Sequence, residues 1–314
     1  MSAVPDVNHV ESAGSADSPD SRDAAGGGGS IQRGPVGRLV SAVGSGVVQL
    51  FLVIVAIFWL VPSFGLLIAS FRPESDNSTS GWWTALTKPA QLTLENYQNL
   101  LQNGAITHSF LNTVYITVPA TLLVIILASL AAYAFAWLDF PGRDWLFILV
   151  VGLLVVPIQV ALIPVAQLYG TLGIFGTRLS VILFHVAFGL PFAVFLLRNF
   201  FAGIPRDLLE AARMDGASEW TIFRKVILPL GLPAIASLGI FQFLWVWNDL
   251  LIALVFASSD AAPLTVALQS QVRQFGANID LLSSGAFLSL IVPLIVFFSF
   301  QRYFVQGVMA GSVK

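Results

Sequence analysis

The stretch PRDLLEAARMDGASEWTIFRKVILP, residues Pro205–Pro229, is the long polar insert between apolar runs near the middle of the chain. Its residues predict a helix, a turn and a second helix. Pro205 suits a first helical position, because the N–H that it lacks would have no partner there. Gly216 stands where a helix end favours a residue that tolerates positive φ, and Ser218 can cap the following helix through its hydroxyl. Pro229 predicts the next boundary, since it disfavours helical backbone at the residue before it.

The first predicted helix has two distinct faces. Leu208, Ala211 and Ala212 share one face at i, i+3, i+4 spacing, and Arg206 is expected to pair with Glu210 on another. The first face is apolar with mostly small side chains, so that a partner can approach the backbone closely. A solvated loop without a partner is the alternative, but two ordered helices with a glycine break favour a docking element.

The composition indicates a membrane protein. Of the 314 residues, 56% are hydrophobic and only 10% are charged, whereas soluble domains carry about 25% charged residues. The net charge of −2 gives no support for a nucleic-acid partner. The chain has no cysteine, which excludes disulfides, thiolate metal sites and a cysteine nucleophile. The pattern predicts an all-α polytopic membrane protein.

The N-terminal segment, residues 1–46, differs from the rest of the chain. It is rich in Ser, Ala, Gly, Asp and Pro, and it includes the run Gly26–Ser30. Such a segment cannot bury enough apolar surface to offset its chain entropy, so we predict a disordered cytoplasmic tail. It is not a secretory signal, because no long apolar run starts before Val47.

Six apolar runs are long enough to cross a bilayer, for which about 20 residues are needed. They are Val47–Ala69, Ser109–Leu138, Leu146–Leu168, Leu179–Phe201, Leu232–Ala257 and Gly285–Phe304. Each contains a proline, and a proline inside a helix frees a backbone carbonyl that neighbouring helices or water must satisfy. This favours a protein-lined pathway over helices that face only lipid. We thus expect residues 47–70 to form the first transmembrane helix and residues 109–304 to form the transmembrane core.

Lysine and arginine set the predicted orientation. With a cytoplasmic N-terminus, most of the 15 Lys and Arg residues fall on the cytoplasmic side, and the exceptions are Arg72, Lys88, Arg178 and Arg273. The positive-inside rule therefore predicts that both termini and the loop 205–229 face the cytoplasm. Residues 71–108 and 258–284 then form extracytoplasmic loops, and residues 305–314 form a cytoplasmic tail. Thr93 is expected to cap a short surface helix in the first of these loops.

The sequence contains no recognisable catalytic or metal-binding constellation. Its three histidines, His9, His108 and His185, lie in different parts of the chain, and His185 fits an interhelical hydrogen bond better than a proton relay. There is no phosphate-binding loop, so the chain has no usual means of binding ATP itself. We expect no catalytic residue, no metal and no cofactor on this chain.

Polar side chains inside the apolar runs are candidates for lining a transport pathway. Asp249 is the one carboxylate well inside such a run, where a charge points to a pathway or a pairing partner. The alternative is a carboxylate near the outer end of its helix, hydrogen-bonded to loop amides. Trp247, next to Asn248, can stack on a sugar ring, although helix packing is the favoured role. Gln159 and Gln242 can line a wet cavity or bond across helices.

The loop resembles that of a known family. The triplet Glu210-Ala211-Ala212, Gly216 and the run Val226–Pro229 match in type and spacing the "EAA" signature of bacterial ABC-importer permease subunits. The resemblance implies that the loop forms coupling helices that dock into a cleft of a cytoplasmic ATPase. The residues implied in this coupling are Glu210, Ala211, Ala212, Asp215 and Gly216.

The resemblance covers about residues 47–314. The segments Pro157–Pro164, Trp247–Asp249 and Gln301–Lys314 look like the carbohydrate-uptake branch of that family, specifically the maltose-type second permease. It implies a complex of two different permeases, an ATPase dimer that holds ATP and Mg, and an extracytoplasmic solute-binding protein. It also implies that the loop 258–284 reaches toward the binding protein. A C-terminal contact with the ATPase dimer is implied for Gly307, Ala310, Gly311 and Lys314.

The sequence therefore predicts the permease subunit of an ABC importer in the bacterial cytoplasmic membrane, which moves a sugar or a related solute by alternating access. An ion-gradient-driven secondary carrier or channel is the alternative. It requires ionisable pairs inside the membrane, for which only Asp249 and His185 qualify. A membrane scaffold without a pathway is disfavoured by the prolines and by the polar residues inside the spans.

Overall fold

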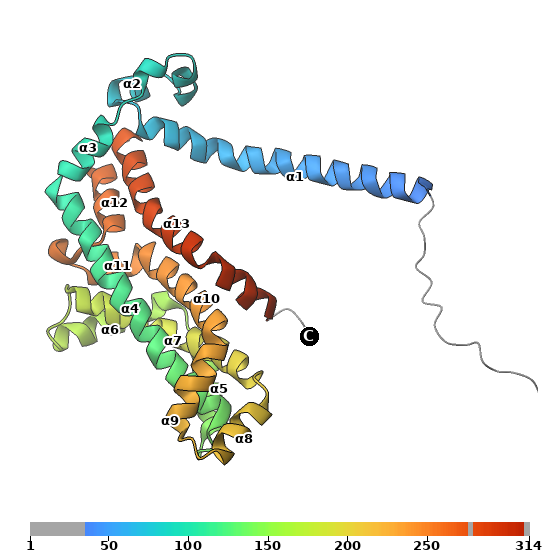
Figure 1. The fold of residues 1–314 in the computed structure, drawn as a ribbon. Coiled ribbons are helices and arrows are strands. Elements are labelled where there is room, and N and C mark those ends of the chain that lie inside the picture. Colours follow the sequence, from blue (N-terminus) through green and yellow to red (C-terminus); the bar gives the residue numbers. More distant parts are fainter. Residues whose placement is uncertain (1–34, 276–278, 311–314) are drawn as a thin grey trace, which may run out of the picture. The chain divides into compact units, whose positions relative to one another are not determined.

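The computed structural model describes residues 35–275 and 279–310, with side chains over 46–270 and 279–301 (Figure 1). The described backbone is helical almost throughout and has no strand, only an isolated bridge between Gly176 and Ala257. The elements in chain order are α1 (Pro35–Ser70), α2 (Glu74–Thr79), η1 (Trp82–Leu86), η2 (Pro89–Gln91), α3 (Glu95–Gln102), α4 (Gly104–Trp137), α5 (Arg143–Leu153), α6 (Ile158–Thr171), α7 (Arg178–Ala202), α8 (Arg206–Met214), α9 (Glu219–Ile222), η3 (Phe223–Ile227), α10 (Leu228–Trp247), α11 (Leu251–Phe256), η4 (Ser259–Ala261), α12 (Leu264–Phe275) and α13 (Ile279–Ala310).

Five helical segments of the described chain are long and apolar enough to cross a membrane. They are Gly46–Ser70 in α1, all of α4, all of α7, the continuous helix Glu219–Trp247, and Ile279–Gln301 in α13. α5 and α6 are long and apolar enough to cross a membrane only when they are counted together as one broken span. With this pair the number of candidate spans is six. The predicted all-α polytopic fold is therefore confirmed, and its third span is the one that departs from a simple rod.

The third span is broken where the sequence prediction has one helix from Leu146 to Leu168. α5 and α6 meet at an angle of 102° across Leu154–Pro157. The N–H groups of Leu154, Val155 and Val156 bond three residues back, as in a tight 3₁₀ turn. Pro157 then offers no N–H and takes extended backbone at ψ 131°. The predicted run Leu146–Leu168 is therefore divided into two helices, because a proline that follows a tightened turn ends the first of them.

The fifth span begins earlier and ends earlier than predicted. The helix runs without a break from Glu219 through Pro229 to Trp247, although Pro229 was expected to mark a boundary. A π-turn at Phe223–Ile227 precedes the proline, and the N–H of Leu228 bonds to the carbonyl of Phe223. A wider turn relieves the clash between a proline ring and the carbonyl four residues before it. The second helix of the loop is thus the first part of a span.

Other helix ends also differ from the sequence prediction. The backbone is helical from Pro35, inside the segment 1–46 that was expected to be disordered, and residues 1–34 lie outside the described part. Once an apolar helix exists, extension adds one hydrogen bond for each residue fixed, and Pro35 suits its first position. α13 covers Ile279–Ala310 rather than Gly285–Phe304, and it has Asp280 in its first turn, where the helix dipole favours an acid.

The chain divides into two compact units, of which the second, Leu60–Lys314, is described next. It is built around α4, α7 and α10. α4 packs most extensively on α7, and α10 packs on both α13 and α4 (Figure 1). Small residues at the contacts let the backbones approach closely, as in other membrane helix pairs. Ala120, Ala128 and Ala132 of α4 are fully buried, as are Phe184 and Leu197 of α7. Within this unit, α4 leads from α3 toward the end where α8 and α9 lie.

A compact segment between α1 and α4 is organised around Arg72. The Arg72 side chain is fully buried. Its Nη2 donates to the Asp76 carbonyl (2.9 Å), Ser80 Oγ (2.7 Å) and Thr84 Oγ1 (3.1 Å). Its Nη1 donates to Asn77 Oδ1 (3.3 Å) and to the Ser80 carbonyl (3.2 Å). Nearby, α3 begins at Glu95, and its N-cap is Leu94, which makes no side-chain cap hydrogen bond. The prediction of Thr93 as the cap was therefore wrong, and the Thr93 hydroxyl instead accepts from the N–H of Glu95 (3.1 Å) in a local turn before the helix.

Candidate functional site

The helix α8 presents one side to the bundle and the other to its surroundings. Leu209 is fully buried, and Ala212 is half-buried against the core cluster of the unit. Leu208 and Ala211 are exposed. The expected face of Leu208, Ala211 and Ala212 is therefore divided, because Ala212 turns inward with Leu209. The side of α8 that is open to a partner is instead marked by Leu208, Ala211 and the exposed Glu210.

The expected ion pair on α8 does not form among the described residues. Arg206 and Glu210 take part in none of the ion pairs found there. Both line a polar hollow of about 190 Å³ together with Arg143, Asp139 and Arg213. An arginine placed before a glutamate at i, i+4 is the weaker order for such a pair, which is worth about 0.2–0.5 kcal/mol at best.

The turn after α8 has the geometry that the sequence predicts. α8 ends at Met214, and Gly216 takes φ +78°. The N–H of Ala217 bonds to the Ala212 carbonyl (3.0 Å) and that of Gly216 to the Arg213 carbonyl (3.0 Å), which is the Schellman pattern that satisfies carbonyls at a helix end. The predicted cap is also confirmed, since the N–H of Thr221 donates to Ser218 Oγ (3.3 Å).

Large apolar side chains stand in solvent around this turn. Met214 is 84% exposed and Trp220 is 62% exposed, one on each side of Gly216. Leu208 adds a third exposed apolar group. The exposed and polar Glu210 and Asp215 lie between them in the chain. Apolar anchors with polar groups interspersed are the composition of protein interfaces.

A clamp of three side chains ties this loop to α4. The hydroxyl of Tyr133, on α4, donates a short hydrogen bond to the Glu219 carboxylate. Arg213 Nε donates to the same carboxylate (3.0 Å), and Arg213 Nη2 donates to the Trp137 carbonyl at the end of α4 (3.5 Å). The hydrogen bond that Arg213 donates to the Glu219 carboxylate raises the pKa of Arg213 above its ordinary value. We call Tyr133, Arg213 and Glu219 the α4 clamp.

Sequence reasoning missed the α4 clamp. Tyr133 is a buried tyrosine inside an apolar run, and only its hydroxyl signals a polar role, since a buried Tyr O–H normally has a partner. Its partner, Glu219, is far away along the chain and close only in the fold. Tyr133 also packs on Phe223, with ring centroids 5.2 Å apart.

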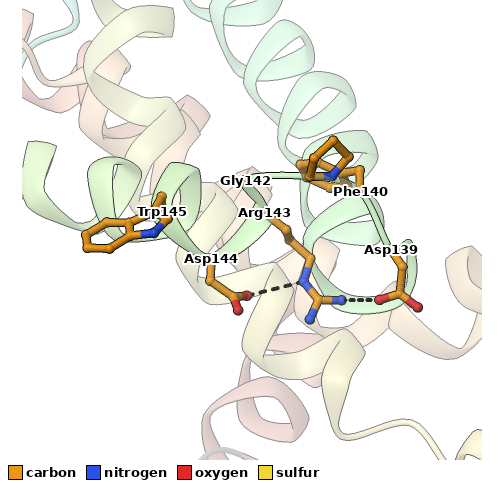
Figure 2. A pocket seen from close by; sticks show the side chains of 7 residues that line it. Asp139, Phe140, Gly142, Arg143, Asp144 and Trp145 are labelled. Carbon is orange, nitrogen blue, oxygen red and sulfur yellow. Dashed lines mark hydrogen bonds and ion pairs between the residues drawn. The ribbon is translucent and has the colours of Figure 1, made fainter.

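The turn between α4 and α5 lies beside the α8–α9 loop. Arg143 lies between two carboxylates, with Nη1 2.8 Å from Asp139 Oδ1 and Nε 3.3 Å from Asp144 Oδ1 (Figure 2). Gly142, which directly precedes Arg143, takes φ +81°. Figure 2 shows Trp145 directed away from this group. Arg143 and Asp139 also line the polar hollow of α8, so the two loops share one polar surface.

A second polar cluster lies where α7 meets the break between α10 and α11. The carboxylate of Asp249 accepts hydrogen bonds from the N–H groups of Ile252 (3.2 Å) and Ala253 (2.9 Å), and so caps α11. Both N–H groups belong to the first turn of α11, whereas the alternative to a pathway role expected a bond to loop amides. Asp249 Oδ2 also lies 3.8 Å from Nε2 of the buried His185, whose Nδ1 is 2.9 Å from the Val181 carbonyl.

The remaining pathway candidates are not gathered at one place. The Trp247 ring is buried, donates to the Ser289 carbonyl (3.0 Å) and stacks on Phe243, which is the packing role that the sequence favours. Asn248 is exposed and donates to the carbonyl of its own helix at Leu244 (2.8 Å). Gln159 is exposed on α6. Gln242 is buried on α10, without a partner for Nε2 in the described structure.

Of the C-terminal candidates, Gly307 and Ala310 belong to the last turns of α13. Their side-chain surroundings, as well as Gly311 and Lys314 altogether, lie outside the described residues. In the part of the chain that is described, no group of three His, Cys, Asp or Glu side chains is placed to hold a metal ion.

Comparisons with known proteins place this architecture in one family. The family model described as binding-protein-dependent transport system inner membrane component matches residues 109–310. The osmoprotective compounds uptake permease protein GgtD of Synechocystis sp. is 52% identical over 272 residues, which cover 85% of this chain and 91% of that protein. The alpha-glucoside transport system permease protein AglG of Rhizobium meliloti is 49% identical over 255 residues, covering 79% of this chain and 67% of that protein.

A solved structure shares the fold. A chain of a bacterial ABC transporter involved in the import of the acidic polysaccharide alginate superposes with a TM-score of 0.68 at 23% identity. The superposition covers 86% of this chain and 98% of that one. Because a matching family model and relatives of this identity span most of the sequence, this chain belongs to the family of binding-protein-dependent transport system inner membrane components.

Proposed function

We propose that this chain is one of two permease subunits of an ATP-driven importer for a neutral, sugar-like solute. The α8–α9 loop is its docking element for a cytoplasmic ATPase, and ATP with Mg is held by that partner. The observation that carries the proposal is the exposed Met214 and Trp220 around a Schellman turn, on a loop whose inner side is tied to the bundle.

The loop is suited to pass motion into the membrane. Since α9, η3 and α10 form one helix, a displacement at Trp220 moves α10 without an intervening hinge loop. The α4 clamp connects the same loop to α4. Closing of the ATPase on ATP would thus act on two spans at once and change the side to which the pathway opens. The shift is limited to the difference in free energy with which the partners bind the two states.

The remaining assignments follow from this placement. Both termini and the α8–α9 loop face the cytoplasm, as the distribution of Lys and Arg indicates. Glu210, Ala211, Ala212, Asp215 and Gly216 belong to the docking element, with Ala212 on its supporting side. Gly307, Ala310, Gly311 and Lys314 form a second ATPase contact. An extracytoplasmic binding protein delivers the solute on the opposite side, where residues 258–284 lie.

The substrate class rests on the relatives. One is named for osmoprotective compounds and another for alpha-glucosides. A third, 34% identical over 230 residues, is the trehalose transport system permease protein SugB of Mycobacterium tuberculosis. Two of the three names are those of neutral carbohydrates, and we assign neutral carbohydrates and related solutes to this chain.

Two variants at Gly216 test the docking element. Proline is restricted to φ of about −65°, so Gly216→Pro should break the turn and abolish substrate-stimulated ATP hydrolysis in the assembled complex. Asparagine tolerates the left-handed conformation, so Gly216→Asn is the matched control and should retain most of the activity. Equal activity of the two variants, with both present in the membrane, would refute the assignment.

Crosslinking tests the partner directly. The chain has no native cysteine, so Met214→Cys carries the only thiol of this chain, at a position that is 84% exposed. We expect a thiol crosslinker to join it to a nucleotide-hydrolysing protein in cells. Leu209→Cys is the control, because Leu209 is buried and should give no product. Absence of an ATPase in the Met214→Cys product would remove the coupling role.

A second candidate function is favoured by one observation. The buried His185 lies beside Asp249, and an ionisable pair inside a membrane is what an ion-driven carrier would need. Reconstituting the purified chain alone separates the two. Ion-coupled solute flux without an ATPase would favour the carrier, whereas a dependence on the ATPase and on ATP supports the importer.

A further inference from the structure

A cavity of about 280 Å³ lies between α7 and α10, apart from the docking loop. Its lining is mainly aromatic and includes one side-chain amide. The lining side chains are Phe188, Phe192, Leu238, Phe241, Gln242 and Trp245. None of them carries a charge. A charged solute would therefore lose its hydration there without a compensating partner.

The amide of Gln242 is fitted into this site by Gly189. A Cβ at position 189 would come within 2.8 Å of both Nε2 and Oε1 of Gln242, so a side chain there would displace the amide from its present position. Gln242 is 4% exposed, and its Nε2 has no hydrogen-bond partner among the described residues. An amide that is buried and unpaired is destabilising. Its terminal torsion is broad, so that the amide can turn toward the cavity.

Aromatic walls around one amide define the chemistry of the occupant. A pocket of this kind holds a ligand by its apolar faces and orients it through a few polar groups. The occupant therefore has an apolar face, no net charge and a hydroxyl that can exchange hydrogen bonds with an amide. A site built to bond a hydroxyl also rejects an analogue that lacks it, because the buried amide is then left unpaired.

We propose that this cavity is a solute subsite on the transport pathway that binds the neutral, hydroxylated ring of a carbohydrate, with Gln242 as the hydrogen-bonding group and Gly189 as the residue that makes space for it. The proposal rests on the importer function given above and adds the place and the chemistry of one contact. It differs from the cluster of Asp249 and His185, which caps α11 and bonds to backbone groups.

An aromatic cage of this size also suits a quaternary ammonium group. The buried amide favours the hydroxylated ring, since a quaternary nitrogen offers the Gln242 Nε2 no acceptor, and the carboxylate of a betaine would lose its hydration in a cavity without charged side chains. Glycine betaine is therefore the competitor that separates the two ligand classes.

Thiol labelling tests whether the cavity is wet. Phe192 and Phe241 are exposed lining residues, and each is replaced by cysteine in the assembled transporter in proteoliposomes. Leu183→Cys is the control, because Leu183 is also exposed but lies on the opposite side of α7 from Phe192. With about 3.6 residues per turn, the two positions are half a turn apart around the helix. We expect a charged methanethiosulfonate to label Phe192→Cys and Phe241→Cys and to spare Leu183→Cys.

Protection identifies the occupant class. Labelling is repeated with maltose, sucrose, trehalose and glycine betaine, each alone. Slower labelling with at least one of the three sugars, and none with glycine betaine, is the expected result. Protection by glycine betaine alone, protection by none of the four, or no labelling of either lining cysteine would overturn the proposal.

Two substitutions test the role of the amide through the Michaelis constant. Gln242→Leu removes the amide, and Gly189→Ala pushes a methyl group against it. Each should raise the KM for the protecting sugar about tenfold, the change that follows from the loss of one hydrogen bond. Gly170→Ala is the matched control, because nothing lies within 4 Å of its added Cβ, and its KM should equal that of the wild type.

The outcomes separate this subsite from the function on which it rests. If the wild type transports a sugar and both variants keep its KM, the subsite is wrong and the importer stands. If the wild type transports no sugar, the assigned substrate class is wrong, and the labelling and protection results still decide whether the cavity is a wet site for a hydroxylated ring.

Discussion

Two arginine side chains of this chain, Arg72 and Arg213, are stabilised in opposite ways. Arg72, in the segment between α1 and α4, is fully buried and donates to five carbonyl, amide and hydroxyl oxygens without a carboxylate nearby in the described structure. Arg213, at the α8–α9 loop, has a side chain that is 40% exposed and pairs with the equally open Glu219. The Arg72 cation is held by neutral backbone and side-chain oxygens, and the Arg213 cation by an exposed opposite charge.

The difference concerns how easily each region can move. The acceptors of Arg72 come from one compact stretch, Asp76–Thr84, and a small displacement would leave a buried cation unsatisfied, which is costly. An exposed ion pair is worth only about 0.2–1 kcal/mol, so it can open and re-form at little cost. We interpret the Arg72 segment as a rigid frame and the α8–α9 loop as the part built to move.

The largest expected effect is at Arg72. Replacing Arg72 by Ala should destabilise the protein by about 3 kcal/mol or more, since a single hydrogen bond to a charged group contributes about 1.5–3 kcal/mol. Arg72→Lys should rescue little, because an ammonium group cannot reach the same acceptors as a planar guanidinium. Denaturant unfolding of the purified protein measures both. The exposed Lys88→Ala is the control, and an equal loss there would contradict the distinction.

The next effect is at Tyr133, which joins the mobile loop to the bundle. Tyr133→Phe removes the hydroxyl that bonds to the Glu219 carboxylate, and we expect a loss of about 1.5–3 kcal/mol, the range for hydrogen bonds to charged groups. The number of solute molecules imported per ATP should also fall, because the loop loses its connection to α4. Tyr115→Phe, at an exposed tyrosine of the same helix, is the control. Unchanged coupling in Tyr133→Phe would show that the clamp is only structural.

The smallest effect is expected at Arg213. Arg213→Gln should cost no more than about 0.2–1 kcal/mol, as for other exposed ion pairs. The difference from the wild type should shrink as salt is raised, since the screening length falls from about 10 Å at 0.1 M to about 3 Å at 1 M. Unfolding at low and high salt measures this. A large and salt-independent loss would place Arg213 in the same class as Arg72.

Much of the fold was open to prediction from the sequence, because apolar runs and turn residues act locally. The length and apolarity of the spans follow from the cost of leaving backbone groups unpaired in lipid. Gly216 and Ser218 form the turn and the cap that their chemistry predicts, since both depend on a few neighbouring residues. The family resemblance at Glu210–Gly216 is likewise a local pattern, and the comparisons confirm it.

Only the tertiary structure decided the rest. Pro157 ends a helix and Pro229 does not, because a tightened turn precedes the first and a π-turn precedes the second. Gln242 meets Gly189, and Tyr133 meets Glu219, across helices that the sequence does not order in space. A local pattern determines which residues can be helical, but partners that are distant in sequence are chosen by packing, where close contact and the pairing of buried polar groups have to be satisfied together.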